Sequence, residues 1–500
     1  MRRNSRARRG GRAAWVFVLT AALTATLTAS PAAQGADGAA EASAIAAADA
    51  AASNDPRLLN DVVAIAAGEA AVYAVKADGT AWAWGGKRDS GLLGNGSTVP
   101  VLSPVRMRID GVKDIAGGAE HTLILKTDGT VWATGSNRYG QLGVGDASLD
   151  SVTVPVQVPG LEDIAAIAAA NHHSVALQKD GTVWQWGMVD PFLAGNPEPK
   201  KVEGLPPVNA VSAGYMYGIA LGGGGEVWTW GAETTSESQA DRLKPPTQVK
   251  GLDEARGISA GRTKTAAIGW TGDVYAWRSM RTFDSWSKLH EPVHIQDAFN
   301  VVQLEGGNTA DFFTFRKADG TVWFWDMYWE QSAYQAKRAE GIEGAVDLAN
   351  SWTGRYALLS NGTVVEFDTS SGDEPPTVTP VHAAVRIVLE GEPVELTVPP
   401  RRIGGSYYVP LRGVFEHLGA EVRWIPERNA VYAKKDATTI EMDMASKRTT
   451  VNGVVVPVDL SPVSVNYVTM VPLRFLAETL GYRVEWREAE HTIAIERSRE

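Results

Sequence analysis

Residues that could do chemistry are sparse in this sequence. There is no cysteine, so thiolate catalysis and disulfides are excluded. Among the eight histidines, His290 and His294 have the spacing of metal ligands on a helix. Pro292 lies between them and disfavours the helix, and no HExxH motif accompanies them. We therefore predict no metal site and no resident cofactor.

Two glycine-rich stretches could form phosphate-binding loops. The stretch TGSNRYGQLGVGD at residues 134–146 and the run GGGG at residues 222–225 both lack the Lys-Ser/Thr ending that such a loop needs. Asp146 and Asp150 could join a calcium loop, but their spacing matches no EF-hand. Carboxylate pairs for glycoside hydrolysis need not be close in sequence, so an extracellular polysaccharide-acting enzyme, a lyase or glycosidase, stays open as an alternative. No catalytic residue is singled out.

An internal repeat supplies the elements that would position any site. KTDGTVWATG, which begins at Lys126, has six relatives, and the turn glycines are 42 to 52 residues apart. Asp-Gly or Asn-Gly between alternating runs predicts a two-residue hairpin whose central residues both have positive φ. Ten of the seventeen Trp lie at two positions after these turns, which indicates core packing between sheets. The turn glycines are Gly79, Gly129, Gly181, Gly225, Gly272, Gly320 and Gly362.

A second element of each unit precedes the turn. GGAEHTLIL at Gly117 matches AANHHSVAL at Ala169, so His121 and His173 fall at equivalent positions. A histidine at a repeat position is more often a hydrogen-bonded structural residue than a ligand. We predict that role for both.

The glycine-rich stretch gives the repeat its family resemblance. Gly135-Ser136-Asn137 followed by Gly140-Gln141-Leu142-Gly143 and Gly145 resembles the regulator-of-chromosome-condensation repeat, and an imperfect copy occupies residues 84–96. The resemblance extends from about Asp61 to Asp368. It implies a seven-bladed β-propeller, and the seven hairpins agree with that number independently.

The C-terminal part contains its own duplication. YVPLRGVFEHLGAEVRW begins at Tyr408 and TMVPLRFLAETLGYRVEW at Thr469. Each copy predicts a strand, a short helix that begins at a proline, and a second strand. Two sets of residues have helical spacing, and we expect Gly419 and Gly481 to end the helices in the left-handed conformation. These sets are Leu411, Val414, Phe415 and Leu418 in the first copy, and Leu473, Leu476, Ala477 and Leu480 in the second.

This duplicated segment resembles the copper amine oxidase N-terminal domain, also called the stalk domain. The two V-P-L-R motifs, the trailing Leu-Gly and Val-x-Trp, and VNGVVV from Val451 carry the resemblance, which covers about His382 to Arg497. In that family a different domain holds the copper and the quinone, and Asn466-Tyr467 is followed here by Val468 rather than by an acidic residue. The resemblance therefore implies a non-catalytic spacer or attachment module.

The N-terminus has the features of an export signal. Six arginines lie among the first 12 residues, an uncharged stretch follows from Ala13 to Ala29, and small residues come next. We predict cleavage near Ala32 or Ala36, no stable membrane span after cleavage, and a secreted or cell-envelope-associated bacterial protein; an uncleaved anchor is the alternative. The formal net charge of -11 disfavours nucleic acid.

The expected organisation is mainly β. It comprises a signal peptide (1–32), an Ala-rich linker (33–57), a seven-bladed propeller (58–369), a linker (370–381) and a small α+β stalk domain made of two strand-helix-strand halves (382–498). We expect a secreted, non-catalytic binding scaffold for an extracellular protein, wall polymer or carbohydrate. A secreted inhibitor resembling the propeller-type inhibitor of β-lactamase is a further alternative. Export argues against a small GTPase as partner.

Loops that differ from unit to unit are the expected binding residues. Each lies between an upstream glycine and the next strand, and the repeat places them on one face of the ring. Aromatic and Arg residues outside the packing positions are favoured at interfaces, although ordinary loop packing would also account for them. Trp286, Tyr328 and Trp329 also fall outside the core pattern. The candidates are Glu69, Glu120, Asn171, His172, Tyr215, Tyr217, Arg262, Trp270, Asp311, Trp352 and Arg355.

Overall fold

The computed structural model describes residues 57–498 with gaps, and the chain is mainly β. The predicted signal and most of the following linker, residues 1–56, lie outside the described part. The gaps are residues 147, 190–194, 233–242, 253, 279–290, 308–311, 327–334, 353, 369–376, 397, 404–405, 444, 457–461 and 466–467.

Residues 62–380 form consecutive four-stranded antiparallel sheets, an arrangement consistent with a propeller. The first sheet has β1 (Val62–Ala67), β2 (Ala71–Lys76), β3 (Ala81–Gly85) and β4 (Val101–Arg106). The second has β5 (Val112–Gly117), β6 (His121–Lys126), β7 (Val131–Ser136) and β8 (Ser151–Gln157). The third has β9 (Ile164–Ala170), β10 (His173–Gln178), β11 (Val183–Gly187) and β12 (Asn196–Lys201).

The remaining sheets of this part follow the same order. The fourth has β13 (Val208–Gly214), β14 (Tyr217–Gly222), β15 (Val227–Ala232) and β16 (Leu243–Gln248). The fifth has β17 (Ala255–Ala260), β18 (Lys264–Gly269), β19 (Val274–Arg278) and β20 (Val293–His294). The sixth has β21 (Val301–Gly306), β22 (Phe312–Lys317), β23 (Val322–Asp326) and β24 (Lys337–Arg338). The seventh has β25 (Ala345–Asn350), β26 (Arg355–Leu359), β27 (Val364–Phe367) and β28 (Val378–Pro380).

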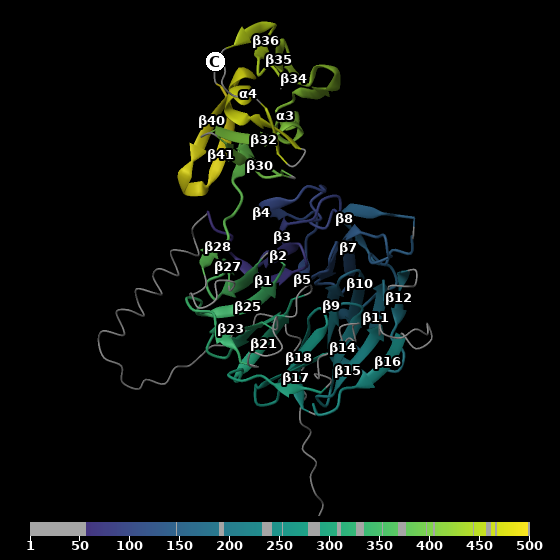
Figure 1. Cartoon of the computed structure of the whole chain (residues 1–500). Coiled ribbons are helices and arrows are strands. Elements are labelled where there is room, and N and C mark those ends of the chain that lie inside the picture. The colour runs from purple at the N-terminus through teal and green to yellow at the C-terminus, as the bar shows by residue number, and fades with distance from the viewer. Residues whose placement is uncertain are drawn as a thin grey trace, which may run out of the picture.

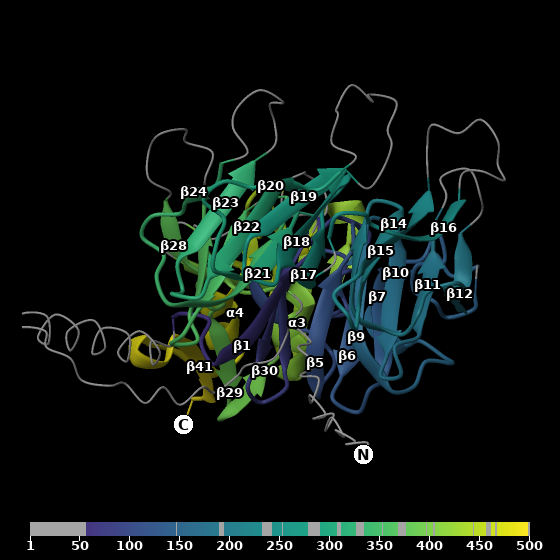
Figure 2. The ribbon, with the colours of Figure 1, turned by 90° about the horizontal axis from the view of Figure 1, so that it is seen from below.

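The first strands of these sheets surround a central axis (Figure 1). Each contacts the first strand of the next sheet, and β25 contacts β1, so the series closes on itself. Residues 378–380, which the sequence placed in a linker, instead form β28 of the seventh sheet. The ends are joined by Leu59 N, which donates to Val381 O at 3.0 Å, and Ala383 N, which donates to Arg57 O at 2.8 Å. Seen from below the view of Figure 1, the sheets stand next to one another (Figure 2).

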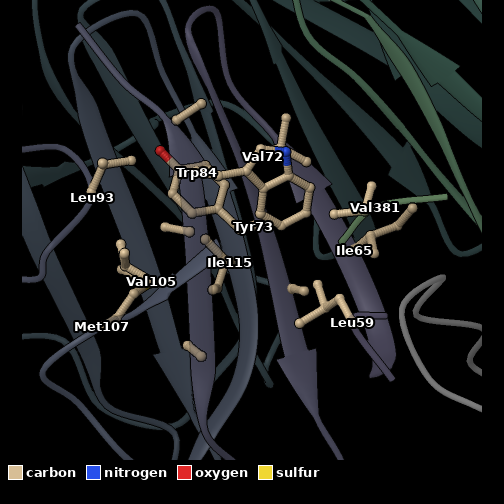
Figure 3. Close-up of a cluster of buried hydrophobic side chains, with 14 of the residues drawn as sticks. Leu59, Ile65, Val72, Tyr73, Trp84, Leu93, Val105, Met107, Ile115 and Val381 are labelled. Carbon is tan, nitrogen blue, oxygen red and sulfur yellow. The ribbon is translucent and has the colours of Figure 1, made fainter. Parts of the chain in front are cut away.

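The paired tryptophans of the hairpins divide into two environments. Trp84, Trp186, Trp230, Trp277 and Trp325 are buried between sheets, as predicted. The first tryptophan of a pair is half-buried. Its indole N–H donates to a threonine hydroxyl two residues earlier in Trp82 (to Thr80, 3.2 Å) and Trp323 (to Thr321, 3.1 Å), whereas Trp184 donates to Gln178. Figure 3 shows Trp84 beside Tyr73 in the first of the buried clusters, with Leu93 and Val105 nearby.

The hairpin turns correct one expectation. In DGT turns such as the one at Gly79, the glycine has positive φ (78°) but the preceding aspartate does not. The carboxylate Oδ1 of Asp78 accepts hydrogen bonds from both the backbone N–H (2.9 Å) and the hydroxyl (2.6 Å) of Thr80. This side-chain cap holds the turn without a second left-handed residue.

Each first strand also carries a β-bulge that the sequence did not predict. The pairing register shifts around the strand's second residue, for instance between Val62 and Ala64 in β1 and between Ala345 and Asp347 in β25. A bulge turns the side chains that follow it. Here it sets which residues face the axis.

The C-terminal part contains three further sheets and two helices. One sheet has the order β30 (Glu392–Val394), β29 (Arg386–Leu389), β41 (Thr492–Arg497), β40 (Tyr482–Arg487), and another has β31 (Arg401–Ile403), β32 (Ser406–Pro410), β39 (Val468–Pro472), β38 (Val463–Val465). The third has β33 (Glu421–Ile425), β34 (Ala430–Lys435), β35 (Thr438–Asp443), β36 (Thr449–Val451), β37 (Val454–Val456). Short 3-10 turns cover Pro426–Arg428 and Glu488–Glu490.

Both predicted helices of the duplication are present. α3 (Leu411–His417) follows Pro410 and α4 (Leu473–Thr479) follows Pro472. All eight residues with helical spacing are buried, and Gly419 (φ 74°) and Gly481 (φ 86°) are left-handed, as predicted. The helices are too short to cross a membrane, and no spanning helix occurs among the described residues.

The C-terminal part packs on the first sheet, beside β4 (Figure 1). Val398, Tyr408 and Met470 belong to the same buried cluster as Val105 and Met107. At the margin, Arg106 pairs with Glu395 at 2.5 Å. The contact is therefore an apolar centre with a charged edge.

Candidate functional site

A rim of loops lies where the first strands end. We define the rim as the described residues of the loops between first and second strands: 68–70, 118–120, 171–172, 215–216, 261–263, 351–352 and 354. Neighbouring loops are joined by backbone hydrogen bonds: Glu69 N to Gly118 O (3.0 Å), Ala119 N to Asn171 O (2.8 Å) and Trp352 N to Glu69 O (3.0 Å). The rim is thus a linked surface and not a set of separate loops.

Charged side chains of the rim interact across loops. Glu120 pairs with Lys87 at 2.5 Å; burial alone would raise the pKa of Glu120, but the ion pair lowers it below its ordinary value. Burial raises the pKa of Glu69, and the nearby charge of Glu120 adds to the rise while Lys87 and Arg262 oppose it. Glu69, Glu120 and Arg262, named from sequence, are therefore close enough to affect one another.

Aromatic groups lie on the same rim. His172 stacks on Tyr139, with ring centroids 4.7 Å apart, and the Arg262 guanidinium lies 5.4 Å from the ring centre of Tyr215. Trp352 is 71% exposed although its backbone is held by Glu69. The rim therefore carries an exposed tryptophan as well as charged groups that interact across its loops.

Three candidates do not contribute to the rim surface as expected. Tyr217 is buried in β14, and its hydroxyl lies 2.9 Å from Gly261 O and 2.7 Å from Lys264 O, so it joins the fourth sheet to the fifth. Trp270 is exposed but lies in the β18–β19 turn, at the other end of the strands. The Arg355 side chain lies over Phe312, 4.4 Å from the ring centre, which is a packing role.

Other named residues lie outside the described part of the chain. They are Asp311, Trp286, Tyr328 and Trp329. Asn171, by contrast, is described: it has positive φ (46°) and its carbonyl accepts from Ala119, so its backbone rather than its side chain shapes the rim.

Two rim contacts involve residues that sequence reasoning missed. Lys87 and Tyr139 come from the long loops between third and fourth strands, and each reaches the first loop of the following sheet. These loops were interpreted only as markers of the repeat. Their length and their variation outside the glycines were the available signal.

The two repeat histidines are structural, as predicted for His121. Its Nε2 lies 2.9 Å from Ser174 Oγ, and both His121 and His173 are buried. Burial lowers the pKa of His121 to about 3 and that of His173 to about 4, so both rings are neutral at pH 7. Within the described ranges, no group of three or more His, Asp or Glu residues is arranged to hold a metal ion.

A channel runs along the axis of the ring, between the first strands. It encloses about 210 Å³ and is lined mainly by Ala, Gly and Ser of the first strands. Asp114, Glu305 and Asp347 converge there from three sheets. Both oxygens of Asp347 accept hydrogen bonds, from Ile65 N (2.9 Å), Leu348 N (2.9 Å) and Gln303 Nε2 (2.6 Å), so this carboxylate is held in a structural role.

The fold and rim define a repeat propeller with an appended domain, and comparison with known families agrees. The chain contains regulator of chromosome condensation (RCC1) repeats, matched at residues 78–125, 128–177 and, by a second model, 112–141. It also contains a copper amine oxidase N-terminal domain, matched at residues 388–495. No curated protein matches the chain.

Solved structures similar to the chain include several propellers. Yeast RCC1 (Prp20) bound to Kap60 is 16% identical, covers 72% of this chain and 90% of its own, and has a TM-score of 0.50. Human WBSCR16 is 20% identical, with coverages of 58% and 84% and a TM-score of 0.49. The CRINKLY WD40 ectodomain of the Arabidopsis thaliana receptor kinase ACR4 is 16% identical, with coverages of 65% and 99% and a TM-score of 0.40. The likeness to yeast RCC1 supports the fold alone.

Proposed function

We propose that the chain is an exported, non-catalytic binding protein: a seven-bladed propeller whose rim binds a protein partner, with the C-terminal domain as spacer or attachment module. The observation that carries the proposal is Trp352, which is 71% exposed on a rim that also holds the Lys87–Glu120 pair and Arg262 beside Tyr215. A rigid surface with an exposed aromatic anchor loses little entropy on binding. Yeast RCC1, an RCC1 propeller, is solved in complex with the protein Kap60, which accords with a protein partner here.

The structure offers a matched pair of substitutions for testing the rim. Trp352 and Trp270 are exposed to almost the same extent, 71% and 72%, but lie at opposite ends of the strands. The protein without residues 1–36 is offered to culture fluid, envelope proteins and purified wall fragments of the producing cell. A bound component is identified by cross-linking and mass spectrometry, and its affinity is then measured. We expect Trp352→Ala to weaken binding at least about tenfold and Trp270→Ala to leave it unchanged.

The result that contradicts the rim is equal retention of the component by both variants. A wall fragment or carbohydrate as the bound component would keep the rim but replace the protein partner. Export is tested separately, by N-terminal sequencing of the protein recovered outside the cell: a mature end near residue 33 or 37 supports signal cleavage, and an intact Met1 in the membrane fraction supports an anchor.

Convergence of carboxylates in the channel is the one observation that favours an enzyme acting on extracellular polysaccharide. Against it, Asp347 is engaged by three hydrogen-bond donors. Glycoside hydrolysis needs two carboxyl groups free to reach the scissile bond. Release of reducing sugar from wall polysaccharide by the wild type and not by Glu305→Gln would reverse this preference.

A further inference from the structure

Glu305 breaks the pattern of the channel. We compare the residue that lies three positions after the bulge in each first strand. In six of the seven described strands this residue is Ala or Ser, and in β21 it is Glu305. The six small residues are Ala66, Ala116, Ala168, Ser212, Ser259 and Ala349. The Glu305 side chain is half-buried in the channel with Asp347 and Asp114, so partial burial and two like charges disfavour its charged form.

Hydrogen bonds around Glu305 and Asp347 connect the sixth, seventh and first sheets. Gln303 of the sixth sheet donates to Asp347 of the seventh at 2.6 Å, and Ile65 N of the first sheet donates to the other oxygen of Asp347 at 2.9 Å. Asn350 of the seventh sheet donates to Glu305 O at 2.9 Å. Asp347 therefore lies at the seam where the last sheet meets the first, with Glu305 on the adjacent strand.

We propose that this seam is a proton-controlled closure of the ring, tight while Glu305 is protonated and loosened when Glu305 ionises beside Asp347. The cause is local repulsion. Ionised Glu305 places a second negative charge near the carboxylate that bonds to Ile65, inside the ring, where partial burial weakens screening by solvent. The device concerns the stability of the scaffold and does not depend on which partner the rim binds.

The electrostatic surroundings of Glu305 support this assignment. Burial, and then the charges of Asp347 and Asp114, raise its pKa to about 8, against an opposing hydrogen bond from Gln303. Burial also raises the pKa of Asp347, while its hydrogen bonds and the charge of Arg316 lower it.

The basic groups on the neighbouring strands are otherwise engaged. Arg316 Nε on β22 donates to Gln303 at 3.2 Å, and Arg256 on β17 donates to Val301 O at 2.6 Å. Lys317 on β22 lies over Phe299 and Trp323, 3.8 Å and 3.7 Å from the ring centres. Lys264, at the start of β18, is buried. None of these four is among the groups that shift the pKa of Glu305.

The sign of the effect follows from proton linkage. The pKa of Glu305 in the folded protein, about 8, is above its ordinary value of 4.5, so the unfolded chain binds fewer protons between those two pH values. Stability contributed by the proton is fully present below pH 4.5 and is lost as the pH rises to about 8. The unfolding equilibrium constant should rise by up to about tenfold per pH unit in that window and no further above it.

The experiment compares wild type with Glu305→Gln from pH 5 to 9.5 by urea denaturation. The ratio of their unfolding constants cancels the other titrating groups and should rise with pH to about 8, then level off. Hydrogen exchange, corrected for its intrinsic pH dependence, should show loss of protection at the Ile65 amide of the wild type. The Met188 amide, which donates to His172 O at 2.9 Å in the third sheet, is the internal control.

Two results would overturn the proposal. One is a ratio that stays flat across this range. The other is equal loss of protection at Ile65 in wild type and Glu305→Gln. If the glutamine variant does not fold, Glu305→Ala, which introduces the side chain found in β25 and three other first strands, replaces it in the same comparison.

Discussion

Ser174 on β10 donates its hydroxyl hydrogen to the carbonyl oxygen of Gln141, 2.8 Å away, in the glycine-rich loop of the preceding sheet. The indole N–H of Trp186 donates to the same oxygen at 2.9 Å. The preceding pair of sheets repeats the arrangement, because Thr122 donates to Leu92 O at 2.7 Å. The glycine-rich loop therefore joins consecutive sheets through its buried carbonyl oxygens, which accept hydrogen bonds from side chains of the following sheet.

Removing the Ser174 hydroxyl should lower stability by about 1–3 kcal/mol. Ser174→Ala leaves the buried Gln141 carbonyl with one donor and removes the hydroxyl partner of His121. Trp186→Phe should cost a similar amount or more, because it removes the other donor and leaves a gap in the core. Urea denaturation measures both. Equal stability of Ser174→Ala and wild type would show that this hydrogen bond contributes nothing.

Two left-handed glycines separate backbone strain from packing. Gly143 has φ 73°, and an added Cβ would lie 2.6 Å from Trp186 Nε1. Gly419 has φ 74°, and an added Cβ would meet nothing within 4 Å. Gly419→Ala should therefore cost about 1–2 kcal/mol from strain alone. Gly143→Ala should cost clearly more, measured by thermal and urea unfolding. If the two variants lose similar amounts of stability, the loop must shift to accommodate the added methyl group beside Trp186.

The sequence predicted local structure well and contacts between units poorly. The DGT turns, the helices after Pro410 and Pro472, and the left-handed Gly419 each follow from a few adjacent residues, and all are present. The bulges that aim Asp347 and Glu305 into the channel leave no mark in the pattern, since a bulge depends on the neighbouring strand.

The rim shows the same division. Glu69, Glu120, Tyr215, Arg262 and Trp352 lie on it because the repeat fixes where each first strand ends. Tyr217 was predicted to lie in a loop, but it is the first residue of β14 and its hydroxyl bonds to the next sheet. The sequence of one unit does not show where the neighbouring sheet lies. Lys87 was missed for the same reason, because its partner Glu120 belongs to the following unit.

The contact between the C-terminal domain and the first sheet should depend on its apolar centre. Met470→Ala removes a fully buried side chain and should cost about 2–4 kcal/mol, and it should separate the unfolding of the two parts in calorimetry. Arg106→Ala removes a pair with Glu395 at the exposed margin and should cost less than about 1 kcal/mol. A larger effect from Arg106→Ala than from Met470→Ala would reverse this assignment of the contact energy.

The buried histidines should make the protein sensitive to acid. In the folded state burial lowers the pKa of His121 to about 3 and that of His173 to about 4, from an ordinary value of 6.5. The unfolded chain therefore binds more protons below pH 6.5, so stability is lost as the pH falls from 6.5 to about 4. The loss is on the order of 2–3 kcal/mol for each histidine over that range. His121→Gln should flatten the dependence of the urea midpoint between pH 7 and 4, while His417→Gln, at an exposed position on α3, should not. An unchanged slope in His121→Gln would mean that other groups cause the acid sensitivity.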